Sequence, residues 1–317
     1  MIAANGMRNN IMKIRIGFIG LGMMGFPMLE NLARRGDLEI HAHDVSDMPF
    51  ERLSRVAGWG TALTRAPRLQ DLSACTVVIT MLPNSRITTR TILGDGDAAG
   101  LADILPTGAT IVDMGSSDPA ETLRLLPLLA ERGLSLIDAP VSGGAAKAQS
   151  GQLSIMIGGT PETVETLRPL LSRMGRTLIA AGRPGAAHAM KALNNYVYAA
   201  GLLATAEATA IAERMGLDTA IFADVLNSSS GRNVATETKL KQFILPRDYS
   251  GGFALRLQAK DLALAEGLQA LAGVDAPQLA LCAGLWARAS AALPDDADNT
   301  EIHRFILDRT AGPGKQD

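Results

Sequence analysis

The chain has 317 residues, 47% of them hydrophobic, which is long enough for two domains with buried cores. Its 30 basic and 32 acidic residues leave a formal charge of -2, which argues against a nucleic-acid-binding protein. No apolar run approaches the roughly 18 residues of a transmembrane helix, and residues 1–12 lack the apolar core of a signal peptide. We therefore expect a soluble, cytoplasmic protein with loose tails at residues 1–12 and 311–317.

Up to about residue 183, short apolar runs alternate with helix-length segments. Strands that are apolar throughout and separated by helices indicate a parallel sheet covered on both faces. The expected strands are Ile14 to Ile19, Glu39 to Asp44, Thr76 to Leu82, Thr110 to Asp113, Leu134 to Asp138, Leu153 to Ile157 and Thr177 to Ala180.

The pattern changes after Gly182-Arg-Pro-Gly185, where a stretch rich in Ala and Leu predicts one long helix over Ala186 to Met215. The remaining segments are helical in pattern: Asp218 to Leu226, Thr236 to Ile244, Leu255 to Ala272, Gln278 to Ala292 and Thr300 to Asp308. We expect an α/β domain over residues 13–183 and an all-helical domain over residues 184–317. The apolar residues Leu281, Leu285 and Trp286 suggest that the helical domain also forms an oligomer interface.

Metal binding is not indicated. The two cysteines, Cys75 and Cys282, lie far apart, and the four histidines (41, 43, 188 and 303) form no cluster with ligand spacing.

A glycine-rich loop follows the first expected strand and opens a helical segment: Gly20, Leu21, Gly22, Met23, Met24 and Gly25. This spacing suits a dinucleotide pyrophosphate, which the helix N-terminus stabilises. Asp44, at the end of the second strand, can accept hydrogen bonds from the adenosine ribose and would repel the 2′-phosphate of NADP. NAD is therefore favoured over NADP, although Asp44 could also be a solvated strand end.

Two further strand ends should border the same crevice, since ligands in open α/β sheets lie beyond the carboxyl ends of the strands. Met81, Leu82 and Pro83 are expected on the adenosine side. The segment Asp113 to Ser117, which includes Ser116, is expected on the nicotinamide side. Either segment could equally be an ordinary transition from strand to loop.

Ser142, Gly143 and Gly144 follow a buried-looking strand and predict a turn whose backbone N–H groups converge on a small anion, such as a substrate carboxylate. The alternative is a turn without function.

In the long expected helix, Lys191 and Asn195 lie four residues apart and therefore share a face. A lysine among apolar neighbours suits proton transfer, and the amide can hold a substrate, whereas the alternative for Lys191 is a solvated surface position. We assign Phe253 and Lys260 to the cofactor site, with a plain surface helix as the alternative for Lys260.

Four motifs together resemble the β-hydroxyacid dehydrogenase family, which includes 3-hydroxyisobutyrate dehydrogenase and tartronate semialdehyde reductase. They are Gly17 to Met28, Asp138 to Gly144, Lys191 to Asn195, and Lys260 to Leu262. The resemblance implies a Rossmann domain joined by a long helix to a helical domain, assembled as homodimers or homotetramers. It implies that Lys191 is the catalytic acid/base, that Asn195 and the Ser142–Gly144 turn bind substrate, and that Ser116 and Lys260 contact the cofactor.

The chain departs from the family at Lys147, where a glycine is common, and adds a positive charge at Arg232. Either residue could bind an extra carboxylate or hydroxyl of the substrate, or could simply be solvated.

These observations predict an NAD-dependent oxidoreductase that interconverts a small 3-hydroxy acid and its semialdehyde. The alternatives are an imine reductase of the same fold, against which Lys191 argues, and a catalytically idle NAD-binding module.

Overall fold

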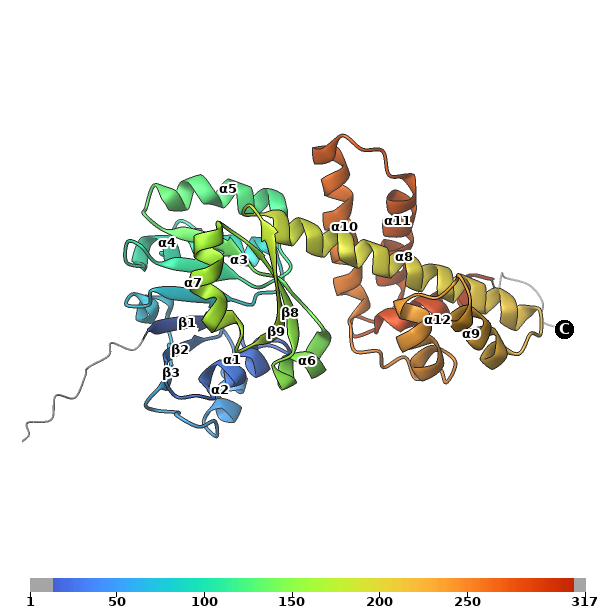
Figure 1. The fold of residues 1–317 in the computed structure, drawn as a ribbon, viewed down its shortest axis with the longest axis horizontal. Coiled ribbons are helices and arrows are strands. Elements are labelled where there is room, and N and C mark those ends of the chain that lie inside the picture. Colours follow the sequence, from blue (N-terminus) through green and yellow to red (C-terminus); the bar gives the residue numbers. More distant parts are fainter. Residues whose placement is uncertain (1–13, 311–317) are drawn as a thin grey trace, which may run out of the picture. The chain divides into compact units, whose positions relative to one another are not determined.

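The computed structural model describes residues 14–310 (Figure 1). The chain folds into two compact units, one ending at Ala187 and the other beginning at His188. The tails expected at residues 1–12 and 311–317 lie outside the described residues. Within the described part, no helix is long and apolar enough to cross a membrane.

The first unit is built on a nine-stranded sheet, mostly parallel. Strands β1 to β6 follow the order β3-β2-β1-β4-β5-β6, which is the Rossmann order and confirms the predicted fold class. The strands are β1 (Arg15–Ile19), β2 (Glu39–His43), β3 (Leu63–Arg65), β4 (Val77–Thr80), β5 (Thr110–Asp113), β6 (Ser135–Asp138), β7 (Val141–Ser142), β8 (Leu153–Gly158) and β9 (Gly175–Gly182).

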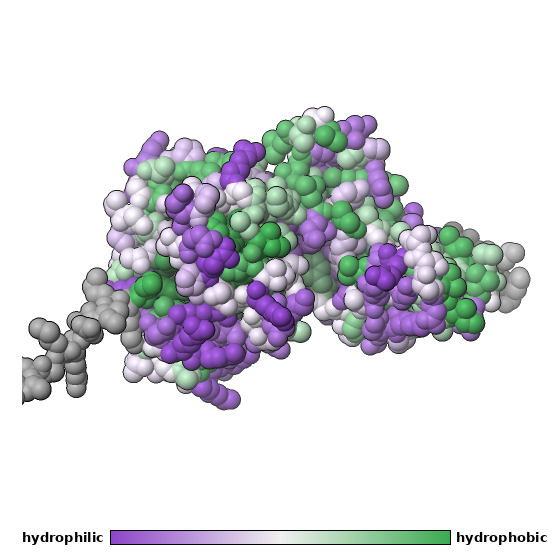
Figure 2. All heavy atoms as spheres, viewed as in Figure 1, coloured by the Kyte–Doolittle hydropathy of each residue, from purple (hydrophilic) through white to green (hydrophobic). Residues whose placement is uncertain are grey.

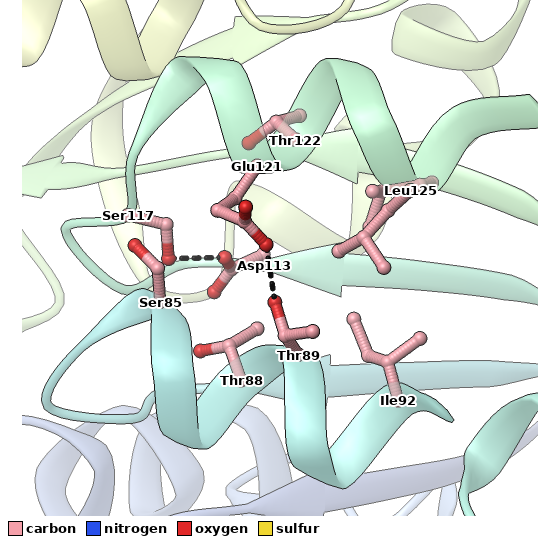
Figure 3. A pocket seen from close by; sticks show the side chains of 10 residues that line it. Ser85, Thr88, Thr89, Ile92, Asp113, Ser117, Glu121, Thr122 and Leu125 are labelled. Carbon is pink, nitrogen blue, oxygen red and sulfur yellow. Dashed lines mark hydrogen bonds between the residues drawn. The ribbon is translucent and has the colours of Figure 1, made fainter. Parts of the chain in front are cut away.

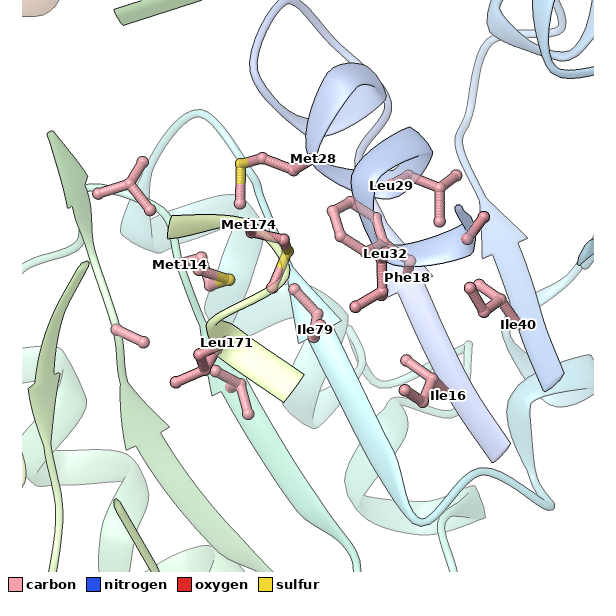
Figure 4. Packing of buried hydrophobic residues seen from close by; sticks show 14 of the residues in the cluster. Ile16, Phe18, Met28, Leu29, Leu32, Ile40, Ile79, Met114, Leu171 and Met174 are labelled. Atoms are coloured by element: carbon pink, nitrogen blue, oxygen red, sulfur yellow. The ribbon is translucent and has the colours of Figure 1, made fainter. Parts of the chain in front are cut away.

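Helices connect these strands and bury their apolar faces against the sheet. Figure 4 shows Phe18 and Ile79 of the sheet close to Met28 and Leu32 of helix α1, all four with no exposed surface. The helices of this unit are α1 (Gly25–Ala33), α2 (Met48–Leu53), α3 (Ser85–Leu93), α4 (Leu101–Ile104), α5 (Pro119–Ala130), α6 (Gly144–Ser150) and α7 (Pro161–Leu171), with a 3₁₀ turn at Leu69–Leu72.

The sheet differs from the prediction in two respects. The short strands β3 and β7 were not expected, because two or three residues carry too little periodic pattern to be recognised. In addition, β8 runs antiparallel to β6 and β7. A parallel crossover needs about a dozen residues or more, and the α6 connection between Ser142 and Leu153 is too short for one.

The second unit holds all but the first two residues of the long helix α8 (Ala186–Arg214). In its described part it has no strand beyond an isolated bridge between Ala254 and Asp298. The other helices are α9 (Thr219–Ser228), α10 (Leu255–Ala272), α11 (Pro277–Ala292) and α12 (Ile302–Thr310), with a 3₁₀ turn at Asn299–Glu301. The segment Thr236–Ile244 is a π-helix, in which the Leu245 N–H bonds to the Leu240 carbonyl five residues earlier.

Local side chains explain why several helices begin where they do. A carboxylate, amide or hydroxyl oxygen at the N-cap accepts a hydrogen bond from a backbone N–H of the first turn, which would otherwise lack a partner. The capping residues are Asn84 for α3, Asp118 for α5, Thr160 for α7 and Asp218 for α9.

The core of the second unit corrects one premise of the sequence analysis. Trp286 is fully buried and Leu285 is 8% exposed, so these two side chains hold the unit together and are not available to a partner. Leu281 is 64% exposed, as expected of an interface residue. Helix α11 therefore turns one face inward and only part of its apolar surface outward.

Asn31 ties α1 to α6 inside the first unit. Its Nδ2 donates to the carbonyls of Pro27 at 2.9 Å, Ala148 at 2.7 Å and Gln149 at 3.3 Å, and the side chain is 4% exposed. The amide thus satisfies buried carbonyls at the end of the short helix that follows the Ser142–Gly144 turn.

Replacing Asn31 with Ala should lower the free energy of unfolding by about 1–3 kcal/mol, because buried carbonyls lose their donor. Urea denaturation followed by circular dichroism measures this change. Gln152→Ala, at an exposed position in the same unit, is the matched control and should stay within about 0.5 kcal/mol. If Asn31→Ala lowers the free energy of unfolding no more than the control does, the proposed link between α1 and α6 is wrong.

Candidate active site

The carboxyl ends of the central strands are aligned by the register of the sheet. Ile19 of β1 pairs with His43 of β2 and Thr80 of β4, and Thr80 pairs with Asp113 of β5. The residues that follow these strands therefore emerge side by side at one edge. This edge includes the point between β1 and β4 where the strand order reverses, and open α/β sheets bind ligands at such points.

The glycine loop is possible only because two of its residues lack a side chain. A Cβ on Gly25 would stand 1.9 Å from the Gly20 carbonyl oxygen, and a Cβ on Gly20 would stand 2.4 Å from the Met81 carbonyl oxygen. Gly20 also has φ +96°, in the region that favours glycine. Strand β1 can therefore turn directly into helix α1 alongside β4.

The middle of this loop is open. A Cβ on Gly22 would meet no atom within 4 Å, Met23 is 77% exposed, and no side chain caps the N-terminus of α1. Backbone N–H groups at an uncapped helix start, beside a glycine that leaves room for approach, suit a pyrophosphate. The residues present therefore fit a dinucleotide cofactor.

Asp44 lies just beyond β2 and is bonded to the glycine loop. Its Oδ2 accepts the Leu21 N–H at 2.6 Å and its Oδ1 accepts the Ser46 N–H at 2.8 Å. A carboxylate has about four acceptor positions, so two remain for a ribose. No ion pair within residues 14–310 neutralises Asp44, which leaves a negative charge beside the loop.

Hydrogen bonds join polar side chains at the carboxyl ends of β4 and β5. Asp113 accepts hydrogen bonds from Thr80 at 3.0 Å and from Ser117 at 2.6 Å, next to Ser116. Figure 3 shows Asp113 and Ser117 among the residues that line a cavity of about 10 Å³, which has room for one water molecule and not for a substrate. Met81 and Leu82 are half-buried and Pro83 is exposed at the neighbouring strand end.

The Ser142–Gly144 turn leads from β7 into α6. Gly143 has φ +134° and Gly144 has φ +70°, values that favour glycine at both positions. Ser142 is half-buried and, as the last residue of β7, pairs with Ser154 of β8. The stem of Lys147 lies against Gly143.

In the second unit, buried side chains of α10 hold Asn195 of α8. Its Nδ2 donates to Asp261 at 2.5 Å, and its backbone carbonyl accepts from Gln258 at 3.1 Å. Asp261 is 2% exposed and Gln258 fully buried. Asn195 is therefore fixed in one orientation, one helical turn from Lys191.

Burial lowers the pKa of Lys191 below its ordinary value. The Asp261 carboxylate opposes this shift, and the Lys260 ammonium reinforces it. Lys191 thus loses its proton more readily than a solvated lysine.

The remaining residues assigned from the sequence lie in the same unit. Lys260 Nζ is 3.2 Å from Asp261 Oδ1, which connects it to the Asn195 cluster. Phe253, half-buried, precedes α10, and its N–H donates to Asp298 at 2.9 Å. Arg232 is an exposed side chain whose Nε lies 3.0 Å from Glu237, so its charge is partly neutralised.

Sequence reasoning gave no role to Asp261 or Gln258, and it placed Asp113 only within the segment expected to face the nicotinamide. Asp261 stands next to Lys260, and that adjacency was the one local signal for it. Both Gln258 and Asp113 are buried polar side chains, which is costly without hydrogen bonds; Gln258 donates through Nε2 and Asp113 accepts from Thr80.

Comparison with known proteins agrees with this geometry. The family profile for the NAD-binding domain of 6-phosphogluconate dehydrogenase matches residues 15–182, and that for the NAD-binding region of NADP-dependent 3-hydroxyisobutyrate dehydrogenase matches residues 185–306. The chain is 36% identical over 253 residues to 2-(hydroxymethyl)glutarate dehydrogenase of Eubacterium barkeri, covering 80% of this chain and 81% of the relative.

Two further relatives extend the match. NAD-dependent L-serine dehydrogenase of Pseudomonas aeruginosa is 36% identical over 278 residues, covering 86% of this chain and 91% of the relative. The structure of Mycobacterium tuberculosis 3-hydroxyisobutyrate dehydrogenase with L-serine has a TM-score of 0.81 at 28% identity, covering 93% of this chain and 99% of that one. The chain therefore belongs to the β-hydroxyacid dehydrogenase family of NAD(P)-binding oxidoreductases.

Proposed function

We propose that this protein oxidises the hydroxyl group of a small 3-hydroxy acid, or reduces the corresponding semialdehyde, with NAD as the preferred cofactor. The names of the relatives support this substrate class. 2-(Hydroxymethyl)glutarate, L-serine and 3-hydroxyisobutyrate each carry a primary alcohol on the carbon next to the one that bears a carboxylate.

The observation that carries the proposal is Lys191, whose pKa is lowered by burial and which stands one turn from an asparagine fixed by Asp261. Removing hydride from an alcohol also requires removing the hydroxyl proton, and a lysine that deprotonates readily can accept it. In the reverse direction the Lys191 ammonium donates that proton to the developing alkoxide.

The other assigned residues divide into two groups. Ser142 and the N–H groups of Gly143 and Gly144 bind the substrate carboxylate, and Asn195 orients the substrate beside Lys191. A bound NAD supplies the hydride acceptor. The residues proposed to hold it are Gly20, Leu21, Gly22, Met23, Met24, Gly25, Asp44, Met81, Leu82, Pro83, Ser116, Phe253 and Lys260. Arg232 is proposed to contact a hydroxyl group at the distal end of the substrate.

Lys191→Ala should reduce kcat by about 10²-fold or more, the usual contribution of a general acid/base, while the affinity for NAD stays unchanged. Lys191→Arg should lose activity as well, because arginine keeps the charge and cannot be deprotonated. In the unaltered enzyme the oxidation rate should rise with pH and level off below the ordinary lysine pKa, because the neutral amine is the active form.

The measurements are kcat against pH and titration of NAD binding by fluorescence. Lys241→Ala, which removes an exposed lysine that pairs with Asp224, is the control. A Lys191→Ala variant that binds NAD and keeps kcat within a few-fold of the unaltered enzyme would disprove the assignment.

The charge of Asp44 should make NAD a better cofactor than NADP. A like charge at about 4 Å costs about 1–4 kcal/mol, depending on the local dielectric, and each 1.4 kcal/mol is about tenfold. Asp44→Asn keeps a hydrogen-bond acceptor and removes the charge, so the ratio of kcat/KM for NAD over NADP should fall by about tenfold. Asp97→Asn, on an exposed loop, is the control. A preference for NADP in the unaltered enzyme would refute the assignment.

Self-association is also proposed, on the basis of exposed apolar side chains in the second unit. Val197 and Ile211, which are 69% and 61% exposed, share one face of α8, and Met215, 68% exposed, directly follows the end of that helix. Hydrophobic residues also reach the surface over α9 (Figure 2), where Ile221 is 62% exposed.

Light scattering should therefore give a mass of at least twice 33.3 kDa at micromolar concentration. Ile211→Glu should shift the protein toward the monomer, because it places a charge within the apolar face. Ile14→Glu, in the first unit, should leave the mass unchanged. A monomeric unaltered protein would contradict the proposal.

A further inference from the structure

Lys147 lies on α6, directly after the Ser142–Gly144 turn. Its side chain folds back across the turn, since a Cβ built on Gly143 would stand 2.7 Å from Lys147 Cδ and 2.9 Å from Lys147 Cβ. This direction is expected, because side chains on a helix tilt toward its N-terminus. The ammonium is two bonds beyond Cδ and is therefore held at the edge of the turn.

The positive charge of Lys147 has no partner within the described chain. Of the lysines in residues 14–310, Lys239 donates to a carbonyl, and Lys241 and Lys260 pair with carboxylates. The ammonium of Lys147 makes no hydrogen bond or ion pair with residues 14–310, and from residue 139 to residue 161 Lys147 is the one charged residue in the sequence. The turn therefore carries an unneutralised positive charge at its edge.

We propose that Lys147 binds a second carboxylate of the substrate, so that the preferred substrates are hydroxy dicarboxylic acids. This inference rests on the proposed function, in which the Ser142–Gly144 turn binds the first carboxylate. A lysine ammonium is a compact point charge that suits an added carboxylate. Because its stem already lies against Gly143, ordering the side chain on binding costs less entropy. Arg232 is less suited, since Glu237 already pairs with it.

The test compares two substrates that differ by one carboxylate, 2-(hydroxymethyl)butanedioate and 2-(hydroxymethyl)butanoate. The unaltered enzyme should prefer the dicarboxylate in kcat/KM. Lys147→Gln should reduce this preference by up to about fivefold, the upper end of the contribution of an exposed charge pair, and the change should appear in KM. Lys147→Arg should keep the preference. Lys241→Gln, which removes a paired exposed lysine, should leave it unchanged.

Two further measurements complete the experiment: the dependence of the substrate preference on ionic strength, and the binding of butanedioate and butanoate. Raising the ionic strength should lower the preference of the unaltered enzyme and have little effect on Lys147→Gln, because screening weakens an exposed charge pair. Calorimetry should show that butanedioate binds more tightly than butanoate, and that this difference is lost in Lys147→Gln. The calorimetric comparison needs no turnover and stands apart from the proposed activity.

The outcomes separate the two proposals. If the enzyme oxidises neither hydroxy acid, and Lys147→Gln still weakens the binding of butanedioate, the result contradicts the proposed function and supports the carboxylate site at Lys147. An unchanged preference and unchanged butanedioate binding in Lys147→Gln would overturn the Lys147 proposal alone. The same conclusion follows if Arg232→Gln, and not Lys147→Gln, removes the preference.

Discussion

The first unit depends on one steric constraint, the close approach of Gly25 to the carbonyl of Gly20. With 1.9 Å between that oxygen and any added Cβ, no other residue allows β1 to turn so sharply into α1. The same turn brings Gly20 against the backbone after β4 and lets Asp44 accept the Leu21 N–H. Removing side chains at two positions thus creates both the packing of the sheet edge and an uncapped helix start suited to a phosphate.

The second unit is organised around buried polar groups. Asp261 and Gln258 are buried in α10, where unpaired polar atoms are costly, and each bonds to Asn195 of α8. This arrangement links two helices and fixes the amide that stands one helical turn from Lys191. The Asp261 carboxylate also offsets part of the effect of burial on the pKa of Lys191. One carboxylate therefore serves both the packing of the unit and the protonation of the proposed acid/base.

The two proposed ligand sites of the first unit carry charges of opposite sign, and each charge suits the ligand proposed for its site. Asp44 is negative at the end of β2, where the ribose of a dinucleotide is expected, and it opposes a further phosphate. Lys147 is positive beside the turn proposed for a substrate carboxylate. Both charges are unpaired within residues 14–310, which leaves each available to a ligand. We propose that single charges such as these select among the members of a ligand class, whereas the chemistry is common to the family.

The sequence was sufficient to predict features formed by residues that lie close together in the chain. The glycine loop, the strand ends, the Ser142–Gly144 turn and the length of α8 each follow from residues close together in the chain, and the family resemblance rests on such segments. Only the tertiary structure identified Asp261 as the partner of Asn195, because the two lie 66 residues apart. The antiparallel direction of β8 and the burial of Trp286 and Leu285 were likewise decided by which elements pack together, and periodicity within one segment carries no information about its neighbours.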